Sequence, residues 1–287
     1  MVDIIHGATG AQGSPVLSAL TAAGRTAIAA VRHPEAVPDG IAARQVDLAS
    51  ADSLASAYEG ADGVFVHLPM GAPEATAAQA RAVVEAVDRT RPGRVVISTS
   101  GQIVDRPDSP LQATADSPIM TLIDGVTGSG IPTAVVAPRL YLENLLLPVV
   151  LAPAHQEGVL RYPLPASFPV SWSSHLDVAD VVARLLMNTS VSGTVAVGHR
   201  PGLTGVDLAA AFSNHLGREV HFEAITPKAF GALITPLFGP AAAPVVELYR
   251  ALNAQDGCII AEDSSAQELL GLRPRPIEQW LKDLAVS

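Results

Sequence analysis

The sequence predicts an α/β fold: a doubly wound parallel sheet covered by helices, with a smaller, mostly helical lobe in the C-terminal part. Short apolar runs alternate with helical patterns over the first 140 residues. A strand at residues 2–6 leads into glycines at 7, 10 and 13 and directly into a helix. Because parallel neighbours in a sheet require crossover connections, this alternation favours a sheet with helices packed on it.

The elements of the first part follow from the spacing of apolar residues. Strands are predicted at residues 2–6, 26–31, 42–46, 63–67, 94–98 and 132–137, and helices at 11–23, 51–58, 73–88 and 117–127. An amphipathic helix at 177–187 and a strand at 194–197 are expected to rejoin the same sheet. We therefore expect a first domain over residues 1–153, with 175–198 added to it, and a smaller lobe over 154–287.

The pattern loosens in the second part, where prolines accumulate at 153, 163, 165 and 169. A helix is predicted at 140–151, further helices at 204–216, 227–237, 242–253, 262–270 and 276–284, and a short strand at 219–223. The apolar segment 241–252 has two interpretations, a homodimer contact or part of the core.

Composition excludes several classes of function. With 18 basic and 28 acidic residues the formal charge is −10, and only two residues are lysines, which disfavours nucleic-acid or anionic-membrane partners. Cys258 is the single cysteine, so neither an internal disulfide nor a multi-cysteine metal site is expected. Prolines interrupt the apolar stretches 145–154 and 230–249, and no basic leader precedes the first strand. These features predict a cytoplasmic protein without a membrane span or bound metal. The low lysine and high alanine content suggests a bacterial origin.

The glycine-rich turn predicts dinucleotide binding. Glycines permit a tight turn and a close approach of the backbone to a pyrophosphate, and the following helix N-terminus offers unpaired N–H groups. The spacing is G-x-x-G-x-x-G, the variant used by short-chain and extended reductases. The predicted contacts in this turn are Gly7, Thr9, Gly10, Ala11, Gln12 and Gly13.

Arg32 indicates which dinucleotide is bound. An NAD-specific domain usually carries Asp or Glu at the end of the second strand, about twenty residues after the glycine loop. Here Arg32 stands in that position, and a guanidinium suits a 2′-phosphate. We therefore expect NADP(H) as the cofactor, with an ordinary surface arginine as the alternative.

Further cofactor contacts are expected where later strands end, because ligands of such sheets bind at the carboxyl ends of the strands. Leu48 could instead be a core residue, and His67 could be a buried, hydrogen-bonded residue at the end of its strand. The predicted contacts are Asp47 and Leu48, then His67, Leu68 and Pro69, then Ser98 and Thr99.

The catalytic pair of classical short-chain dehydrogenases is missing. Those enzymes carry Tyr-x-x-x-Lys on a helix, where the tyrosine supplies the proton. This chain has tyrosines at 58, 141, 162 and 249, and none of them is followed four places later by lysine. A reduction must then use direct hydride transfer to an activated acceptor, or a different acid.

Several motifs together resemble the NmrA-like family of atypical short-chain dehydrogenases/reductases. They are Gly-Ala-Thr-Gly-Ala-Gln-Gly (7–13), Val-Arg-His-Pro (31–34), Ser-Thr-Ser-Gly (98–101), Pro-Arg-Leu-Tyr-Leu-Glu-Asn-Leu-Leu (138–146), His-Leu-Asp-Val-Ala (175–179) and Arg-Pro-Arg-Pro-Ile-Glu-Gln-Trp (273–280). The resemblance covers nearly the whole chain in order. It implies a Rossmann domain that binds NADPH, and the family includes quinone oxidoreductases, triphenylmethane-dye reductases and catalytically silent NADP sensors.

The resemblance also implies site residues. By analogy Tyr141, Glu143 and Asn144 lie at the nicotinamide end, with Tyr141 and Asn144 catalytic and Glu143 contacting the substrate. Phe168, Trp172 and Phe230 could form an apolar wall for a flat acceptor or the core of the small lobe. Many reductases of the family keep a lysine on the helix at 117–128, and this chain has none there.

Three functions remain after these observations. The leading one is an NADPH-dependent reductase that transfers hydride to a quinone-like or conjugated electrophilic small molecule. A catalytically weak NADP(H) redox sensor is favoured by the missing lysines. A tailoring reductase of secondary metabolism would share the first chemistry with a larger substrate.

Overall fold

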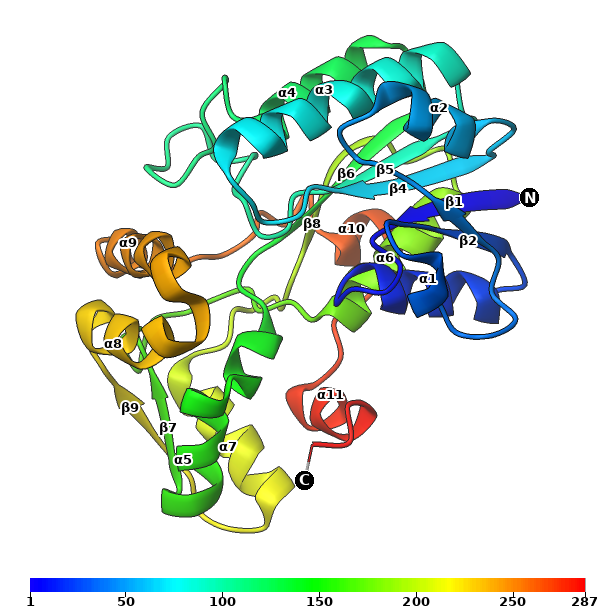
Figure 1. The fold of residues 1–287 in the computed structure, drawn as a ribbon. Coiled ribbons are helices and arrows are strands. Elements are labelled where there is room, and N and C mark those ends of the chain that lie inside the picture. Colours follow the sequence, from blue (N-terminus) through cyan, green and yellow to red (C-terminus); the bar gives the residue numbers. More distant parts are fainter. Residues whose placement is uncertain (287) are drawn as a thin grey trace. The chain divides into compact units, whose positions relative to one another are not determined.

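The structure, a computed structural model, describes residues 1–286 and divides the chain into two compact units (Figure 1). The first unit comprises Met1–Pro138, His175–Val197 and Asp263–Leu272; the second comprises Arg139–Ser174, Gly198–Glu262 and the segment from Arg273 onward. The chain leaves the first unit after Pro138, earlier than the expected boundary at residue 153. The reason is that the residues after Pro138 pair with a strand-like segment of the second unit, described below.

The first unit contains a seven-stranded, all-parallel sheet of Rossmann type, in the order β3-β2-β1-β4-β5-β6-β8. The strands are β1 (Val2–His6), β2 (Thr26–Val31), β3 (Ala43–Gln45), β4 (Gly63–His67), β5 (Val95–Ser98), β6 (Thr133–Pro138) and β8 (Gly193–Val197). The strand order reverses between β1 and β4. Ligands of open parallel sheets bind at such a switch point, at the carboxyl ends of the strands.

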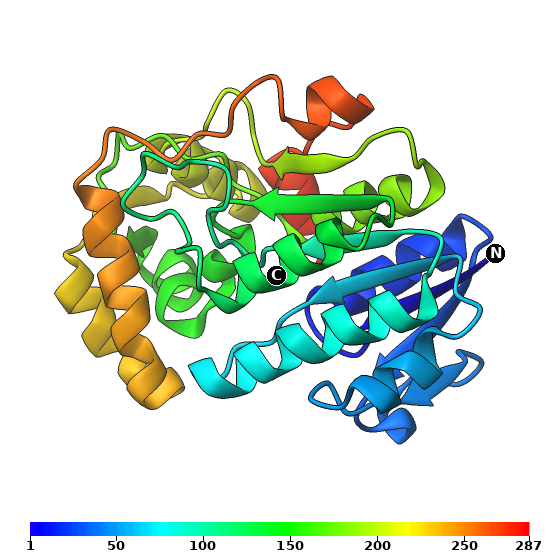
Figure 2. The same ribbon diagram turned by 90° about the horizontal axis from the view of Figure 1, so that it is seen from above.

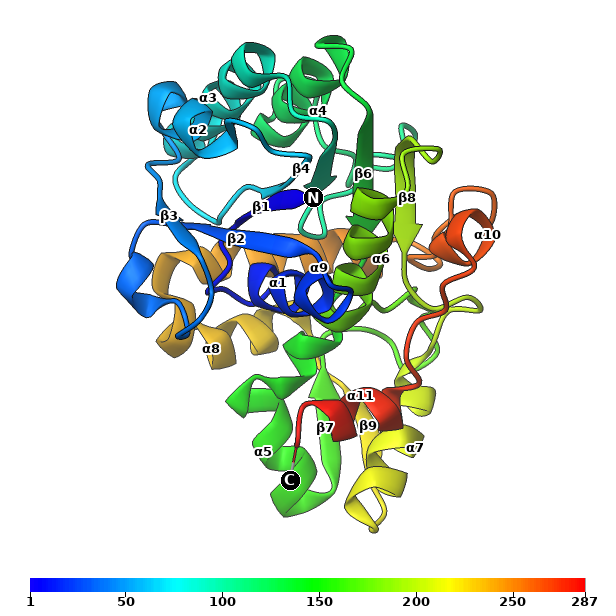
Figure 3. The same ribbon diagram turned by 90° about the vertical axis from the view of Figure 1, so that its right-hand side faces the viewer.

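Helices cover both faces of this sheet. Helices α2 (Ala51–Tyr58), α3 (Pro73–Thr90) and α4 (Pro118–Gly128) lie on one face, and α3 and α4 run side by side (Figures 1 and 2). Helices α1 (Gly13–Ala22) and α6 (His175–Met187) pack together on the other face (Figure 3). A short 3₁₀ helix, η1 (Pro34–Ala36), follows β2, and α10 (Ala266–Leu270) packs near β8. The core under α2–α4 includes Val64, Val83 and Leu122, each fully or almost fully buried.

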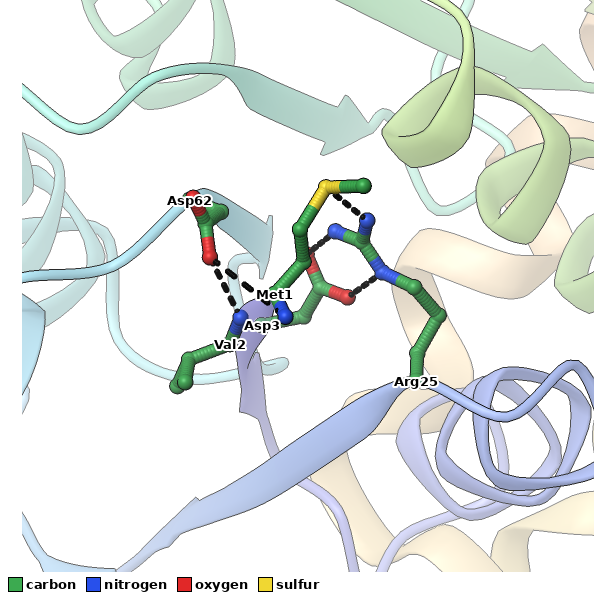
Figure 4. A network of polar contacts seen from close by, with 5 residues as sticks. All are labelled: Met1, Val2, Asp3, Arg25 and Asp62. Atoms are coloured by element: carbon green, nitrogen blue, oxygen red, sulfur yellow. Dashed lines mark hydrogen bonds and ion pairs between the residues drawn. The ribbon is translucent and has the colours of Figure 1, made fainter.

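A buried ion pair fixes the start of the central strand. The Arg25 guanidinium donates two hydrogen bonds of 2.7 and 2.6 Å to the Asp3 carboxylate (Figure 4). The Val2 N–H donates to Asp62 Oδ2 at 2.6 Å in the same network. Space beside Asp3 is tight, because an ideal Cβ on Gly63 would lie 2.4 Å from Asp3 Oδ1. The start of β1 is thereby tied to the segments that lead into β2 and β4.

The second unit is built around a small parallel pair, β7 (Val159–Tyr162) and β9 (His221–Ala224) (Figure 3). Its helices are α5 (Pro148–Glu157), α7 (Gly205–Leu216), α8 (Pro227–Phe238), α9 (Ala242–Asn253) and α11 (Ile277–Asp283), with 3₁₀ helices η2 (Leu142–Leu146) and η3 (Gly239–Ala241). Helix α7 begins with a capping box, in which Thr204 and Asp207 satisfy each other's backbone N–H groups.

An extended segment at 170–173 connects the irregular parts of the second unit. Ser173 N donates to Leu140 O at 2.9 Å, and Leu142 N donates to Ser173 O at 2.8 Å. On the other side, Ser171 N donates to Cys258 O at 3.0 Å. Gly198 has to be glycine beside this segment, because an ideal Cβ would lie 2.2 Å from Ser171 O. The segment therefore holds the Tyr141 region in place through backbone hydrogen bonds.

Several predicted elements differ from the structure. The continuous helix predicted at 140–151 is wrong: Tyr141 is extended, η2 follows, and α5 starts only at Pro148. Pairing with Ser173 competes with helix formation there, and Pro148 suits the first helical position of α5. Strand β7 was not predicted. The helix predicted from residue 262 begins at Ala266, where the Ser265 side chain caps it.

One apolar stretch among the described residues, Pro227–Asn253, is long and apolar enough by composition to cross a membrane. It is not a single straight helix. The chain turns at Gly239, whose φ is 56°, and α9 returns beside α8 (Figure 1). An ideal Cβ on Gly231 of α8 would lie 2.4 Å from Val246 Cγ2 of α9. The stretch is a tightly packed helical hairpin.

Candidate functional site

The glycine turn between β1 and α1 has the tight geometry that the sequence predicts. Gly7 adopts a left-handed conformation with φ of 59°, and its N–H donates to Ala30 O of β2 at 3.2 Å. Gly10 N donates to Gly7 O at 2.8 Å, which closes the turn. An ideal Cβ on Gly13 would lie 2.2 Å from Gly7 O. Only glycine at position 13 lets α1 begin this close to the strand.

The N-terminus of α1 is left open. Gln12 occupies the N-cap position, but its side chain makes no cap hydrogen bond. Among residues 1–286, no partner is found for the backbone N–H groups of Ala11 and Gln12. Thr9, Gly10 and Ala11 are exposed. An uncapped helix N-terminus with free N–H groups is a suitable place for an anionic group.

The Gln12 side chain forms hydrogen bonds with the end of β5 and the residues after it instead of capping α1. Its Oε1 accepts a hydrogen bond from Ser98 Oγ at 2.8 Å, and its Nε2 donates to Ser100 Oγ at 2.9 Å. The glycine turn is therefore connected to the end of β5. Ser98, predicted to contact the cofactor, is fully buried, and its hydroxyl group donates its hydrogen bond to Gln12. Ser98 and Gln12 hold the shape of the turn, and their contact to a cofactor stays a prediction.

Unsatisfied polar atoms lie at the ends of the neighbouring strands. His67 Nε2, on the last residue of β4, and Thr99 Oγ1, directly after β5, are buried without a hydrogen-bond partner in the described chain. His67 also packs under the turn, since an ideal Cβ on Gly7 would lie 2.5 Å from His67 Nε2. Burial lowers the pKa of His67, so the ring is held neutral. Buried polar groups normally find partners, so His67 Nε2 and Thr99 Oγ1 remain candidate contacts for a ligand.

The histidine inside β1 is a structural residue. His6 Nε2 shares a 2.6 Å hydrogen bond with the buried Tyr58 hydroxyl. Burial, with the nearby His67, lowers the pKa of His6 to about 3. His175, at the start of α6, has its pKa lowered to about 4 by burial and then by His67. No group of three or more metal-ligating side chains was found among the described residues.

Arg32 and Asp47 follow β2 and β3 at the same edge of the sheet. Arg32 is exposed, and no partner for its guanidinium is found within residues 1–286. Asp47 Oδ1 accepts from Ala49 N at 2.9 Å, which closes a local turn. Beyond β4, Leu68 is buried and Pro69 half-buried, and Leu48 packs partly buried against the core. The structure thus gathers the predicted cofactor contacts around the carboxyl ends of five adjacent strands, β3-β2-β1-β4-β5.

The second unit holds the residues predicted to be catalytic. Tyr141 and Asn144 belong to the segment that pairs with Ser173, and both are half-buried. Glu143 lies between them, and its Oε1 accepts a 3.2 Å hydrogen bond from Trp280 Nε1 of α11. Trp280 is fully buried. Glu143 therefore links the Tyr141 segment to the C-terminal helix, and a substrate contact for it stays a prediction.

The aromatic residues predicted to face the substrate lie within the second unit. Trp172 and Phe230 are buried and pack on Tyr162, with ring centroids 5.5 and 5.6 Å away. Phe168 is buried as well. The hydroxyls of Tyr162 and Tyr249 are hydrogen-bonded to each other inside this cluster, and neither tyrosine was predicted as a site residue. Tyr162 ends a short strand and Tyr249 lies within α9, and neither position carries a sequence signal that separates it from an ordinary core residue.

Comparison with known proteins identifies relatives across almost the whole chain. A family model described as the NmrA-like family matches residues 3–281. A (4-alkanoyl-5-oxo-2,5-dihydrofuran-3-yl)methyl phosphate reductase from Streptomyces griseus is 30% identical over 284 residues, which cover 96% of this chain and 95% of that protein. An NAD(P)H azoreductase from Xenophilus azovorans is 29% identical over 228 residues, which cover 78% of this chain and 77% of that protein.

Solved structures share the fold at low identity. The triphenylmethane reductase from Citrobacter sp., complexed with NADP(H), superposes with a TM-score of 0.78 at 20% identity, covering 98% of this chain and 99% of the other. An NADPH-dependent quinone oxidoreductase from Escherichia coli superposes with a TM-score of 0.76 at 20% identity, covering 99% of this chain and 100% of the other. These likenesses establish the architecture.

Proposed function

This chain belongs to the NmrA-like family, and from that premise we propose that it is an NADPH-dependent reductase of conjugated, electrophilic small molecules. The full-length match to the Streptomyces griseus reductase is the observation that carries the proposal. The name of that substrate describes a dihydrofuranone ring in which the double bond bears an acyl group and adjoins the ring carbonyl. Such a double bond is an electrophile of the quinone-like, conjugated type.

The residues of the first unit fit NADP(H). The open N-terminus of α1 and the glycine turn at Gly7–Gly13 would receive the pyrophosphate, because free N–H groups and the helix dipole favour an anion. The unpartnered Arg32 guanidinium would bind the 2′-phosphate. The orphaned His67 Nε2 and Thr99 Oγ1 would gain partners on the same molecule. When bound, NADPH supplies a hydride.

The protein's own part in the reaction is to bind and orient. We assign acceptor contacts to Tyr141 and Asn144 of the second unit, where a phenol and an amide can hydrogen-bond a carbonyl and draw electron density from its conjugated double bond. The acceptor gains two electrons with the hydride and takes one proton from water. No Tyr-x-x-x-Lys pair is present to supply that proton, so the protein is an atypical short-chain reductase.

Two other functions are each favoured by one specific observation. The missing Tyr-x-x-x-Lys pair favours an NADP(H) sensor with weak or no turnover. The Streptomyces griseus relative favours a tailoring reductase of secondary metabolism, with a larger substrate. Both share the cofactor site proposed above. A cytoplasmic location in a bacterial cell, a small-molecule substrate and a homodimer are part of the same proposal, and the bacterial relatives support the first two.

Anaerobic NADPH oxidation, followed by absorbance across quinones, acyl butenolides, azo dyes and triphenylmethane dyes, tests the proposal. NADH is run in parallel. We expect saturable turnover with at least one acceptor class and a preference for NADPH. Tight NADPH binding without turnover on any class would favour the sensor instead.

A further inference from the structure

Ser100 has an unusual backbone conformation in the turn at residues 99–102, the β5 turn, which follows β5. Gln102 N donates to Thr99 O at 3.1 Å and closes this turn. The two central residues, Ser100 and Gly101, have φ of 54° and 89°. Positive φ at both central positions is typical of type I′ turns, in which glycine, asparagine and aspartate are the usual residues. Ser100 is therefore held in the left-handed region by its surroundings.

Three hydrogen bonds form a closed ring around Ser100. Its backbone N–H donates to Ser98 Oγ at 3.2 Å. Ser98 Oγ donates to Gln12 Oε1 at 2.8 Å, and Gln12 Nε2 donates to Ser100 Oγ at 2.9 Å. We call these three residues the Gln12 clamp. Because the clamp uses both ends of the Gln12 amide, it joins the glycine turn after β1 to the β5 turn by two side-chain hydrogen bonds.

The β5 turn carries polar groups that lack partners in the described chain. Thr99 N donates to Val136 O of β6 at 3.0 Å, and Thr99 O accepts the bond that closes the turn. The Thr99 backbone is thus fixed, whereas its buried Oγ1 has no partner among the described residues. The half-buried Gly101 also has a backbone N–H for which no partner is found within residues 1–286. The clamp therefore fixes the shape of a turn that has hydrogen-bonding capacity left over.

The strand order places the β5 turn at one end of the proposed cofactor site. In the order β3-β2-β1-β4-β5, Arg32 follows β2 on one side of β1, and the β5 turn lies on the other side. The proposed contacts put the 2′-phosphate of the adenosine half at Arg32 and the pyrophosphate at the glycine turn after β1. Because a dinucleotide lies across the carboxyl ends of the strands, its nicotinamide riboside half then extends toward β4 and β5.

We propose that Gln12 and Ser100 are positioning residues that hold the β5 turn against the nicotinamide half of the cofactor. The proposal rests on the proposed function, because it takes NADPH as the ligand. Gln12 acts through Ser100: its hydrogen bond to the Ser100 hydroxyl helps to keep that residue in the left-handed conformation, so the turn keeps its shape and its place beside the glycine turn. The adenosine half, at Arg32 and the glycine turn, does not depend on the clamp.

Two ligands separate the two halves of the site in calorimetric titrations. NADPH carries both halves, whereas adenosine 2′,5′-bisphosphate carries the adenosine half alone. We expect Gln12→Ala to raise the Kd of NADPH about three- to tenfold, the effect of losing one hydrogen bond of ordinary strength, and to leave the Kd of the bisphosphate unchanged. Ser100→Gly should have the same effect, because glycine adopts the φ of 54° readily but lacks the hydroxyl.

Ser129→Ala is the matched control. It also removes one serine hydroxyl from a hydrogen bond, the 2.6 Å bond to Val126 O at the end of α4. That bond lies before β6, at the amino ends of the strands, so the Kd of both ligands should stay unchanged. Thermal unfolding shows whether each variant is folded at the temperature of the titration. If Gln12→Ala is not, Ser100→Gly decides.

A double variant separates positioning from a general weakening of the fold. Because Gln12 acts through Ser100, adding Gln12→Ala to Ser100→Gly should cost little further affinity for NADPH. Independent, multiplicative losses would overturn the positioning role, as would equal losses for both ligands or a wild-type Kd for NADPH in Ser100→Gly. In those cases the proposed cofactor site stands. A wild-type protein that binds neither ligand would overturn the cofactor site itself, and the positioning role with it.

Discussion

Two arginines near the start of the chain, Arg25 and Arg32, have opposite surroundings. The Arg25 side chain is 8% exposed and is paired with a fully buried Asp3, so its charge serves the fold. Arg32 is exposed at the end of β2, and no partner for its guanidinium is found within residues 1–286, which supports its proposed role in binding the 2′-phosphate. At the residue scale, partners and burial separate a structural charge from a binding charge.

Replacing Arg32 tests its assignment to the 2′-phosphate. Arg32→Glu should raise the dissociation constant of NADPH by about ten- to a hundredfold, since a charged hydrogen bond contributes roughly 1.5–3 kcal/mol. The constant for NADH should change far less. Fluorescence titration with both nucleotides measures this, with Arg81→Glu on the exposed face of α3 as a charge-matched control. An unchanged preference for NADPH would contradict the assignment.

Replacing Arg25 tests the buried ion pair. Arg25→Met should lower the free energy of unfolding by about 3–5 kcal/mol, because the Asp3 carboxylate would be left buried without its partner. The matched control is Arg89→Met. Arg89 bonds Asp52 at 2.7 Å, as closely as Arg25 bonds Asp3, but its side chain is 46% exposed. Its loss should cost far less than the loss of Arg25, because water and salt screen an exposed pair. Equal losses in urea unfolding would show that burial does not govern the contribution of these pairs.

At the scale of single elements, the glycine turn and the start of α1 form one closely packed local structure. The sequence predicted both, because β1, the turn and α1 are contiguous and their geometry is local. The helix predicted at 140–151 was wrong for the opposite reason. Its segment is held extended by Ser173, which lies more than thirty positions away in the chain, and local spacing carries no information about that pairing.

Gly13→Ala tests the turn. Its Cβ would lie 2.2 Å from Gly7 O, so α1 has to move away from β1. We expect a loss of NADPH affinity of at least about tenfold and a destabilisation of roughly 1–3 kcal/mol, as for other overpacked sites. Gly128→Ala at the end of α4, where a Cβ meets nothing within 4 Å, is the matched control and should leave NADPH binding unchanged. Wild-type affinity in Gly13→Ala would show that the close contact is not needed.

At the scale of the whole molecule, the packing of the first unit buries the rings of three histidines. His6, His67 and His175 all have lowered pKa values, mainly through burial. In the unfolded chain a histidine titrates near pH 6.5. A group with a lower pKa in the folded state stabilises the fold above its unfolded pKa, and this stability is lost as the pH falls below that value.

The stability of the protein should therefore decrease on acidification between pH 6.5 and about pH 4. Each buried histidine contributes a slope of up to about 1.4 kcal/mol per pH unit in this range. Urea unfolding at pH 7, 6 and 5 measures the slope. In His6→Gln the slope should be shallower, since the group with the pKa of about 3 is removed while a polar side chain still faces Tyr58. A pH-independent free energy of unfolding would contradict the lowered values.

The sequence by itself determined the parallel α/β sheet, the glycine turn, the family and the place of Arg32 after the second strand. Each depends on motifs, or on the order of short local patterns, that can be read along the chain. Tertiary structure alone decided that Gln12 bonds Ser98 and Ser100, that Glu143 bonds Trp280, and that the hydroxyls of Tyr162 and Tyr249 bond each other. These contacts join residues up to 137 positions apart. A periodic pattern reports which side of an element is buried, but the partner of a buried polar atom depends on how distant segments pack.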